Sequence, residues 1–257
     1  MGAEDKKVVL FIDILGFGNL IENNTNVTDD NCHELTLIFP VFVKTIMEYY
    51  SQEYQEKKGF KFLWASDTIV FSTDVKNSDT LIDELIYLEN QFYCGEMTFR
   101  GCICVGHLFH ENNIWGEALV RAAHAEKYKA NYPRVIVSQD EFYELNLSDK
   151  NKECFVVDEE DGELIYFKPF LENVNQALEN NRVYPKLKVY SGMLCNNYEK
   201  ASENAKGKWV WMMKQFLQVI RGKEFEIDKQ LKLEKKIRPK NDTFQELVEN
   251  IEEIITK

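Results

Sequence analysis

Asp13 and Asp67 are the two residues of this sequence whose surroundings best suit metal-assisted chemistry. Asp13 ends the apolar run Val8–Asp13, which predicts a buried strand, and the segment Gly16-Phe17-Gly18 follows it closely. A buried carboxylate is costly unless it is paired, hydrogen-bonded or bound to a metal ion. Glycines let backbone N–H groups approach an anion, so this strand end would suit a metal-bound phosphate. The simpler alternative is that Asp13 caps a following helix.

Asp67 lies at the turn of a predicted hairpin. The segment Phe60–Thr73 has two β-rich halves on either side of Ala65-Ser66-Asp67, which is typical of two strands joined by a tight turn. The first strand and this hairpin can lie side by side in one sheet. Asp13 and Asp67 would then converge, and converging carboxylates repel each other unless a cation lies between them.

The elements that would position these aspartates follow the order βα–ββα–βαβ. Apolar periodicity predicts helices over Cys32–Gln55, with Pro40 as an irregularity, and over Ser78–Tyr93 and Glu117–Ala130. A strand, a polar turn and a short returning strand are predicted over 99–116, a further strand over 134–138, and a hairpin over 153–169. This order predicts an α/β fold, an α+β sandwich with a ferredoxin-like βαββαβ sheet and helices packed on it.

The sequence changes character near residue 170. Residues 171–257 are charged and helix-forming, with a long helix predicted over Tyr198–Arg221 and a last helix over Thr243–Thr256, after Pro239. We therefore expect a first domain over 1–170 and a mostly helical C-terminal extension over 171–257. The extension could serve dimerisation or regulation.

Composition and charge narrow the class of protein. The 257 residues are 44% hydrophobic and 29% charged, with a formal net charge of −12. Such acidity argues against a nucleic-acid partner but allows a nucleotide, whose phosphates need only a local cation. The start is not a secretory signal, and no apolar run has the ~20 residues of a membrane span. Six cysteines without a CxxC pair predict free thiols, no zinc site and a cytoplasmic protein.

Four segments, in this order, resemble the class III nucleotidyl cyclases. The family opens with a strand of the form F-x-D-I-x-G-F, and the segment 11–17 matches it. Its second metal aspartate lies in a hairpin turn, as Ser66-Asp67 does here. The segment 100–106 is similar to R-x-G-x-x-x-G, and Trp115-Gly116, followed by Ala122, Ala123 and Glu126, is similar to the start of the next helix. The match covers roughly residues 7–140.

The resemblance implies that a ribose 3′-oxygen attacks the α-phosphate while pyrophosphate leaves. Two divalent ions, Mn²⁺ or Mg²⁺, would be held by Asp13, Asp67 and the backbone carbonyl of Ile14. The substrate phosphates and the nucleotide would contact the turn made by Leu15, Gly16, Phe17 and Gly18.

The cation that stabilises the α-phosphate would come from the helix predicted over Glu117–Ala130. His124 stands where the family has an arginine, and Arg121 is on nearly the same helix face. The alternative is that Arg121 is a solvated surface residue. Lys127 and Arg134 are further phosphate-binding candidates, whereas Arg100 could instead form a structural ion pair.

The positions that read the base in purine cyclases differ in this sequence. Leu63 and Asn113 replace the base-reading lysine and aspartate, and Val120 replaces an asparagine of the family. With these departures, the sequence resembles the stand-alone bacterial Pycsar cyclases of anti-phage defence. That resemblance implies UTP or CTP as substrate, with UTP favoured, cyclic UMP or cyclic CMP as product, and a separate effector protein. Leu63 and Asn113 would line the base pocket; Trp64 could do so but is better explained as core packing.

Two other functions fit the same residues. The chain could be a purine cyclase with an unusual base pocket, or a degenerate cyclase domain that binds a nucleotide without turnover. In the resembling family one subunit supplies the metal aspartates and the other supplies the residues after the Trp-Gly motif. The resemblance therefore implies a head-to-tail homodimer with two shared sites.

Overall fold

The computed structural model describes residues 6–18, 35–237 and 244–256. They belong to two compact units. The sheet domain comprises residues 1–85 and 98–167, and the helical domain comprises residues 86–97 and 168–257. The division falls close to residue 170, where the sequence changes character, but the segment 86–97 packs with the C-terminal helices rather than with the sheet.

The sheet domain is built on a seven-stranded sheet of order β2-β3-β1-β4-β7-β9-β8. Every neighbouring pair is antiparallel except β4 and β7. The strands are β1 (Lys6–Ile14), β2 (Phe60–Ala65), β3 (Thr68–Asp74), β4 (Phe99–His107), β7 (Val135–Ser138), β8 (Phe155–Val157) and β9 (Leu164–Phe167). A separate hairpin pairs β5 (Phe109–His110) with β6 (Ile114–Trp115). The mixed α/β sandwich predicted from the sequence is confirmed.

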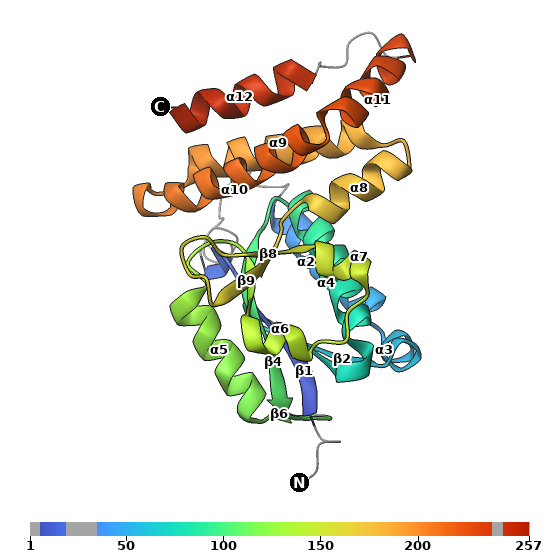
Figure 1. Cartoon of the computed structure of the whole chain (residues 1–257), viewed down its shortest axis with the longest axis vertical. Coiled ribbons are helices and arrows are strands. Elements are labelled where there is room, and N and C mark those ends of the chain that lie inside the picture. The colour runs from blue at the N-terminus through green and yellow to red at the C-terminus, as the bar shows by residue number, and fades with distance from the viewer. Residues whose placement is uncertain (1–5, 19–34, 238–243, 257) are drawn as a thin grey trace. The chain divides into compact units, whose positions relative to one another are not determined.

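Helices cover both faces of this sheet (Figure 1). On one face, α5 (Glu117–Lys129) packs through Ala118 and Ala122 on Val9, Val70 and the thiols of β4. The other face carries α2 (Leu35–Tyr49), α3 (Gln52–Lys58) and α4 (Ser78–Cys94). There the Tyr50 ring lies 5.1 Å from that of Phe71, which follows Val70 on β3. Successive strand residues point to opposite faces, so this alternation fixes which side chains each helix covers.

Two helix predictions were wrong in detail. A single helix was predicted over Cys32–Gln55, but α2 ends at Tyr49 and α3 begins at Gln52, because Ser51 has an extended backbone with ψ 154°. The helix α2 continues through Pro40. Cys32–Glu34 lie outside the described residues.

The long helix predicted over Tyr198–Arg221 is two helices in the structure. These are α9 (Val183–Lys200) and α10 (Glu203–Gly222), separated by the extended backbone of Ala201 and Ser202. The predicted last helix is confirmed as α12 (Phe244–Thr256), and Pro239 lies outside the described residues.

The helical domain buries an apolar core of its own. It comprises α8 (Leu171–Glu179), α9, α10, α11 (Glu224–Ile237) and α12, together with the end of α4 (Figure 1). Phe170, Tyr190 and Phe216 are fully buried at its centre, with ring centroids 5.2–6.4 Å apart. The helical C-terminal extension expected from the sequence is therefore a packed unit. In the part of the chain that the structure describes, no helix combines the length and apolar character needed to cross a membrane.

Candidate functional site

The end of β1 and the β2–β3 turn lie side by side. Asp13 is opposite Thr68 in the β1–β3 register, and the Ile14 N–H donates a hydrogen bond of 2.8 Å to the Asp67 carbonyl. The turn closes with Ser66 in the left-handed region, at φ 59°, which a tight hairpin turn requires. The structure thus brings the backbones of Asp13 and Asp67 together at one edge of the sheet. Both side chains keep partial access to solvent.

The first of the backbone amides expected to bind phosphate after Asp13, that of Leu15, is not available in the structure. The Leu15 N–H donates to the Thr98 carbonyl at 3.0 Å, so this amide is already used within the sheet domain. Gly16 has φ 77°, a conformation that glycine adopts without strain, and Phe17 and Gly18 then enter a helical turn. Amides that bind phosphate here would therefore come from the residues after Leu15.

Arg100 joins Asp13 to the helix α5. Its Nε lies 3.3 Å from Asp13 Oδ2, and the same guanidinium pairs with the buried Glu126 and donates to the Ala130 carbonyl. The alternative interpretation of Arg100, a structural ion pair, is the one the structure supports. A guanidinium beside Asp13 also orients this carboxylate. A metal ion at Asp13 would have to share the carboxylate with Arg100.

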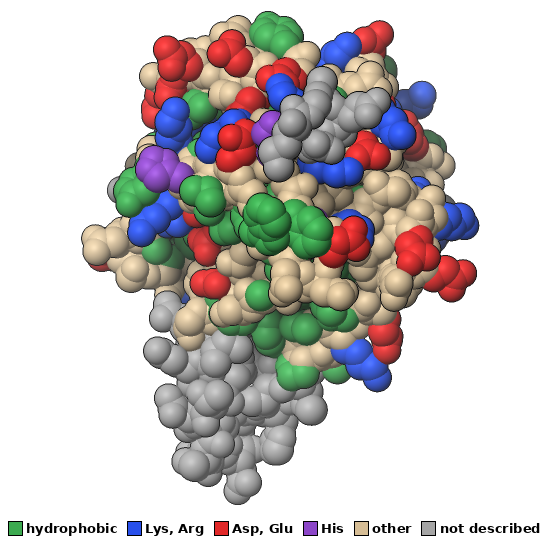
Figure 2. All heavy atoms as spheres, turned by 90° about the horizontal axis from the view of Figure 1, so that it is seen from below, with side chains coloured by type: hydrophobic (Ala, Val, Ile, Leu, Met, Phe, Trp, Pro, Cys, Tyr) green, Lys and Arg blue, Asp and Glu red, His purple; other side chains and the backbone are tan. Residues whose placement is uncertain are grey.

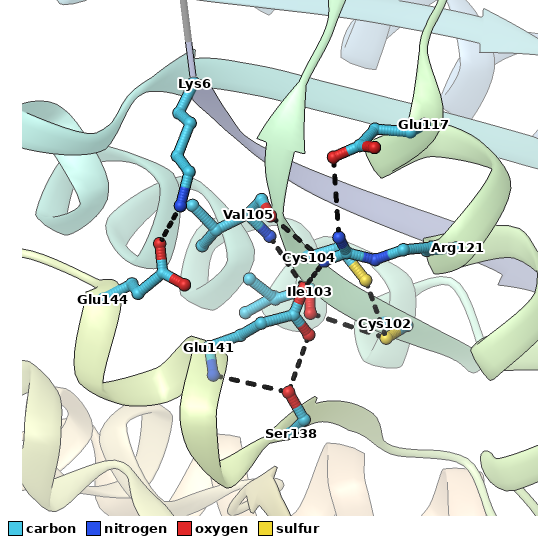
Figure 3. Close-up of polar contacts among 10 residues, drawn as sticks. All are labelled: Lys6, Cys102, Ile103, Cys104, Val105, Glu117, Arg121, Ser138, Glu141 and Glu144. Carbon is cyan, nitrogen blue, oxygen red and sulfur yellow. Dashed lines mark hydrogen bonds and ion pairs between the residues drawn. The ribbon is translucent and has the colours of Figure 1, made fainter. Parts of the chain in front are cut away.

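Arg121 lies far from Asp13 of the same chain. Its guanidinium donates to the Val105 carbonyl at 3.0 Å and pairs with Glu141 of α6 (Gln139–Glu144), as Figure 3 shows. Asp13 is opposite Arg100 on β4, and Val105 is five residues further along that strand, or about 17 Å at the usual rise. Arg121 is therefore anchored to its own domain, and it is not simply a solvated surface residue.

His124 is exposed on α5, where its ring lies 4.5 Å from the ring of Tyr128. One chain therefore supplies the two aspartates and the turn after Asp13 at one place, and Arg121 at another. Lys127 is also exposed on this helix, with its ammonium 5.5 Å from the Tyr128 ring.

The two expected base-pocket residues lie on different elements of the sheet domain. Leu63 is half-buried on β2, and Asn113 is exposed in the β5–β6 turn. Trp64 points to the opposite face from Leu63. Its indole packs edge-on against Phe42 of α2, with 6.3 Å between ring centroids. This packing agrees with core packing as the better explanation of Trp64.

Arg134 is not a phosphate-binding residue, and that prediction was wrong. The side chain is 5% exposed and forms an ion pair with Asp158, which is 7% exposed. Its guanidinium also lies 4.8 Å from the centroid of the Tyr166 ring. Both charges are buried together, so the pair is structural and links the residue before β7 to the residue after β8 across β9.

The donor set at the sheet edge suits a hard cation. Asp13 and Asp67 offer carboxylate oxygens, and Ile14 offers a backbone carbonyl, which are the ligand types that Mg²⁺ and Mn²⁺ prefer. Over the described ranges, no group of three or more histidine, cysteine, aspartate or glutamate side chains is placed to hold a metal ion. The five described cysteines, which exclude Cys32, form no disulfide.

Comparison with known proteins gives distant structural similarity only. No family model matches the chain, and no curated protein matches it significantly. It is similar to two structures of a bacterial light-regulated adenylyl cyclase, at 12% identity and TM-scores of 0.37 and 0.39, with 63% of this chain covered. It is also similar to the adenylyl cyclase CyaB from P. aeruginosa, at 14% identity and a TM-score of 0.36, covering 63% of this chain and 92% of that one. The chain spans about half of the light-regulated cyclases, 50% and 51% of their lengths.

Proposed function

We propose that this chain is a metal-dependent nucleotidyl cyclase that converts UTP, or else CTP, into the 3′,5′-cyclic monophosphate and pyrophosphate. The observation that carries the proposal is the hydrogen bond from Ile14 to Asp67, which holds two carboxylate-bearing backbones at one edge of the sheet. The cyclase-like segments around Asp13, Asp67, Arg100 and Trp115 support it from the sequence.

The residues of this edge have separate tasks in the proposed reaction. Asp13, Asp67 and the Ile14 carbonyl would hold Mn²⁺ or Mg²⁺, which when bound supplies positive charge for the attacking oxygen and the departing pyrophosphate. Arg100 fixes the Asp13 carboxylate by an ion pair of 3.3 Å. The left-handed turn at Gly16 leads the chain into a helical turn, whose first N–H groups are suited to phosphate oxygens.

A second copy of the chain would complete each site. Arg121 lies away from the aspartates of its own chain, so only a partner could bring it to the substrate, and His124 follows it on the same exposed helix. The surface that carries them also exposes large apolar side chains: Trp115, Val120 and Tyr128 are 62%, 68% and 61% exposed. Figure 2, which views the sheet domain from the side where β6 lies in Figure 1, shows hydrophobic side chains exposed among charged ones. Exposed apolar surface of this kind favours an interface.

The pyrimidine substrate rests on the sequence departures at Leu63 and Asn113. The resemblance to the Pycsar cyclases extends the proposal to second-messenger synthesis in anti-phage defence, with a separate effector that responds to the cyclic nucleotide.

Product identification tests the reaction. The purified chain is incubated with each of the four nucleoside triphosphates and Mn²⁺, and the products are identified by mass. We expect cyclic UMP or cyclic CMP, and loss of that product in Asp67→Asn, which keeps the side-chain shape but removes the charge. The matched control is Asp74→Asn at the other end of β3, where the carboxylate pairs with Lys7. Full activity of Asp67→Asn would refute the two-carboxylate site, and a purine product would refute the substrate.

Complementation tests the shared site. Asp67→Asn chains and His124→Ala chains are each expected to be inactive, and a mixed dimer should regain one intact site and part of the activity. Arg121 needs its own control because it also anchors Glu141. If Arg121 acts on substrate, Arg121→Met loses activity whereas Glu141→Gln, which breaks the same ion pair, keeps it. Verified exchange without recovery would contradict the shared site.

The second candidate is a domain that binds a nucleotide without turnover. The specific observation in its favour is the Arg100 guanidinium on Asp13, which already neutralises one of the two carboxylates. That function predicts nucleoside triphosphate binding with no product under any metal condition, and the same incubation separates it from the cyclase.

A further inference from the structure

A polar hollow of about 690 Å³ opens at the end of the sheet domain opposite Asp13 and Asp67. Its walls come from α3, from β1, β2 and β3 near Lys7, Lys61 and Asp74, and from the β5–β6 hairpin. Lys7 and Asp13 are six residues apart on β1, or about 20 Å along the strand. The hollow is therefore separate from the carboxylate site of the same chain, and its volume is that of a small-molecule site.

Each lysine that lines the hollow forms an ion pair with a carboxylate. Lys61 Nζ lies 3.0 Å from Glu111 Oε2, Lys7 pairs with Asp74, and Glu56 accepts a hydrogen bond from Gln52. Since each lining lysine already has a carboxylate partner, the hollow does not favour an isolated phosphate. Lys61 and Glu111 are 46% and 62% exposed. Such an exposed pair contributes little to stability, so it can turn toward a ligand at low cost.

Ser72 and His110 add a polar contact without a charge. Ser72 Oγ lies 2.7 Å from His110 Nδ1, and Ser72 is 3% exposed. Burial, together with the positive charge of Lys61, lowers the pKa of His110 to about 4. The imidazole is therefore neutral at pH 7, where one ring nitrogen donates a hydrogen bond and the other accepts one.

Phe109 supplies a flat apolar surface beside these groups. It lines the hollow, is 44% exposed and stacks on Trp115 with 5.4 Å between ring centroids. An aromatic face next to an ammonium and a carboxylate suits a planar ring whose edge carries an acceptor beside a donor.

We propose that this hollow binds a planar, uncharged heterocycle with neighbouring hydrogen-bond donor and acceptor atoms, the class to which nucleosides belong. Lys61 and Glu111 contact the ring edge, Phe109 contacts the ring face, and the Ser72–His110 pair provides a neutral polar contact. The site goes beyond the proposed cyclisation, because binding here needs neither a triphosphate nor a metal ion.

Ligand-observed NMR and calorimetry test this site with uridine, cytidine and adenosine as probes, on the full chain without divalent metal. At least one nucleoside should bind. Lys61→Met should weaken its binding at least about tenfold, because a charged hydrogen-bond partner of the ring edge is lost. His110→Gln should weaken it as well. The control is Lys44→Met, which removes a lysine from a more exposed ion pair, with Glu48, outside the hollow.

Two results would overturn the proposal. One is that none of the three nucleosides binds at millimolar concentration to a chain shown to be folded. The other is that binding survives both Lys61→Met and His110→Gln but is lost in Asp67→Asn, which would place the ligand at the carboxylate edge. If His110→Gln fails to fold, Glu111→Gln at the exposed rim replaces it. Failure of cyclase activity leaves these binding measurements unaffected, so the two proposals fail separately.

Discussion

Glu89 is a buried carboxylate that should make the helical domain pH-dependent. It lies on the part of α4 that belongs to this domain and is 3% exposed. Oε2 accepts hydrogen bonds from Asn173 Nδ2 at 2.8 Å and from the Phe170 N–H at 3.3 Å, and Oε1 accepts from the Tyr93 hydroxyl at 3.1 Å. These contacts partly offset the loss of water. Burial nevertheless raises the pKa of Glu89 from 4.5 to about 7.

The sign and size of the effect follow from that pKa. Between pH 4.5 and 7 the folded chain holds the Glu89 proton and the unfolded chain does not, so stability falls as the pH rises. A difference of about 2.5 pKa units corresponds to about 3 kcal/mol. This contribution is fully present below pH 4.5 and is lost above pH 7. Glu89→Gln removes the titration and can keep the contacts, since the amide oxygen accepts from Asn173 and Phe170 and the amide nitrogen donates to the Tyr93 hydroxyl.

Urea unfolding at pH 5 and pH 8 measures this pH dependence of stability. The signal is the fluorescence of Trp209 and Trp211, which pack against the core of the helical domain. The free-energy difference between Glu89→Gln and the native chain should shift in favour of the variant by about 2.5 kcal/mol between these pH values, since part of the contribution is already lost at pH 5. Glu203→Gln, at an exposed position of α10, is the control and should show no such shift. Parallel pH dependence of Glu89→Gln and the native chain would refute the reasoning.

Two further predictions concern packing in the sheet domain. Gly101→Ala places a Cβ 2.4 Å from the Phe11 carbonyl oxygen, so the free energy of unfolding should fall by at least about 2 kcal/mol. The control is Gly192→Ala on α9, where a Cβ meets no atom within reach, and it should change the free energy of unfolding by less than about 1 kcal/mol in either direction. Equal effects of the two substitutions would contradict the clash at Gly101. Asp158→Asn leaves the buried Arg134 guanidinium without its carboxylate, so denaturant titration should show a loss of about 3–5 kcal/mol; a loss below about 1 kcal/mol would mean that water or another group compensates the charge.

The parts of the fold with local signals were predictable from the sequence. The β1 run and the β2–β3 hairpin follow from apolar pattern and turn residues, and their pairing placed Asp13 beside Asp67. Some local signals were missed. Ser138 caps α6 by accepting from the Glu141 N–H, while its hydroxyl donates to the Glu141 carboxylate, and this S-x-x-E pattern is visible in the sequence. Ser202, which precedes α10, likewise marks the helix break near residue 200.

The polar partners of the candidate sites could not be predicted. Arg100 and Glu126 are 26 positions apart in sequence, and Ser72 and His110 are 38 apart. Pairs of this kind form only because the sheet and its covering elements meet in three dimensions. No local spacing indicates that a conspicuous arginine, Arg134, is committed to a buried ion pair.

The contacts that hold Arg121 within its own chain determine what must change if Arg121 acts in a shared site. To reach a partner's substrate, Arg121 must leave Glu141 and the Val105 carbonyl. Glu141 would keep two other donors, the Val105 N–H at 3.1 Å and the Ser138 hydroxyl at 2.8 Å, so its carboxylate would not be stranded. Release of Arg121 would therefore exchange the Glu141 carboxylate for a substrate phosphate, while Glu141 keeps its other hydrogen bonds. His124 needs no such release because it is already exposed on α5. If both act, removal of His124 should abolish turnover without affecting folding, whereas removal of Arg121 should abolish turnover and also lower stability, because Glu141 and the Val105 carbonyl each lose a donor.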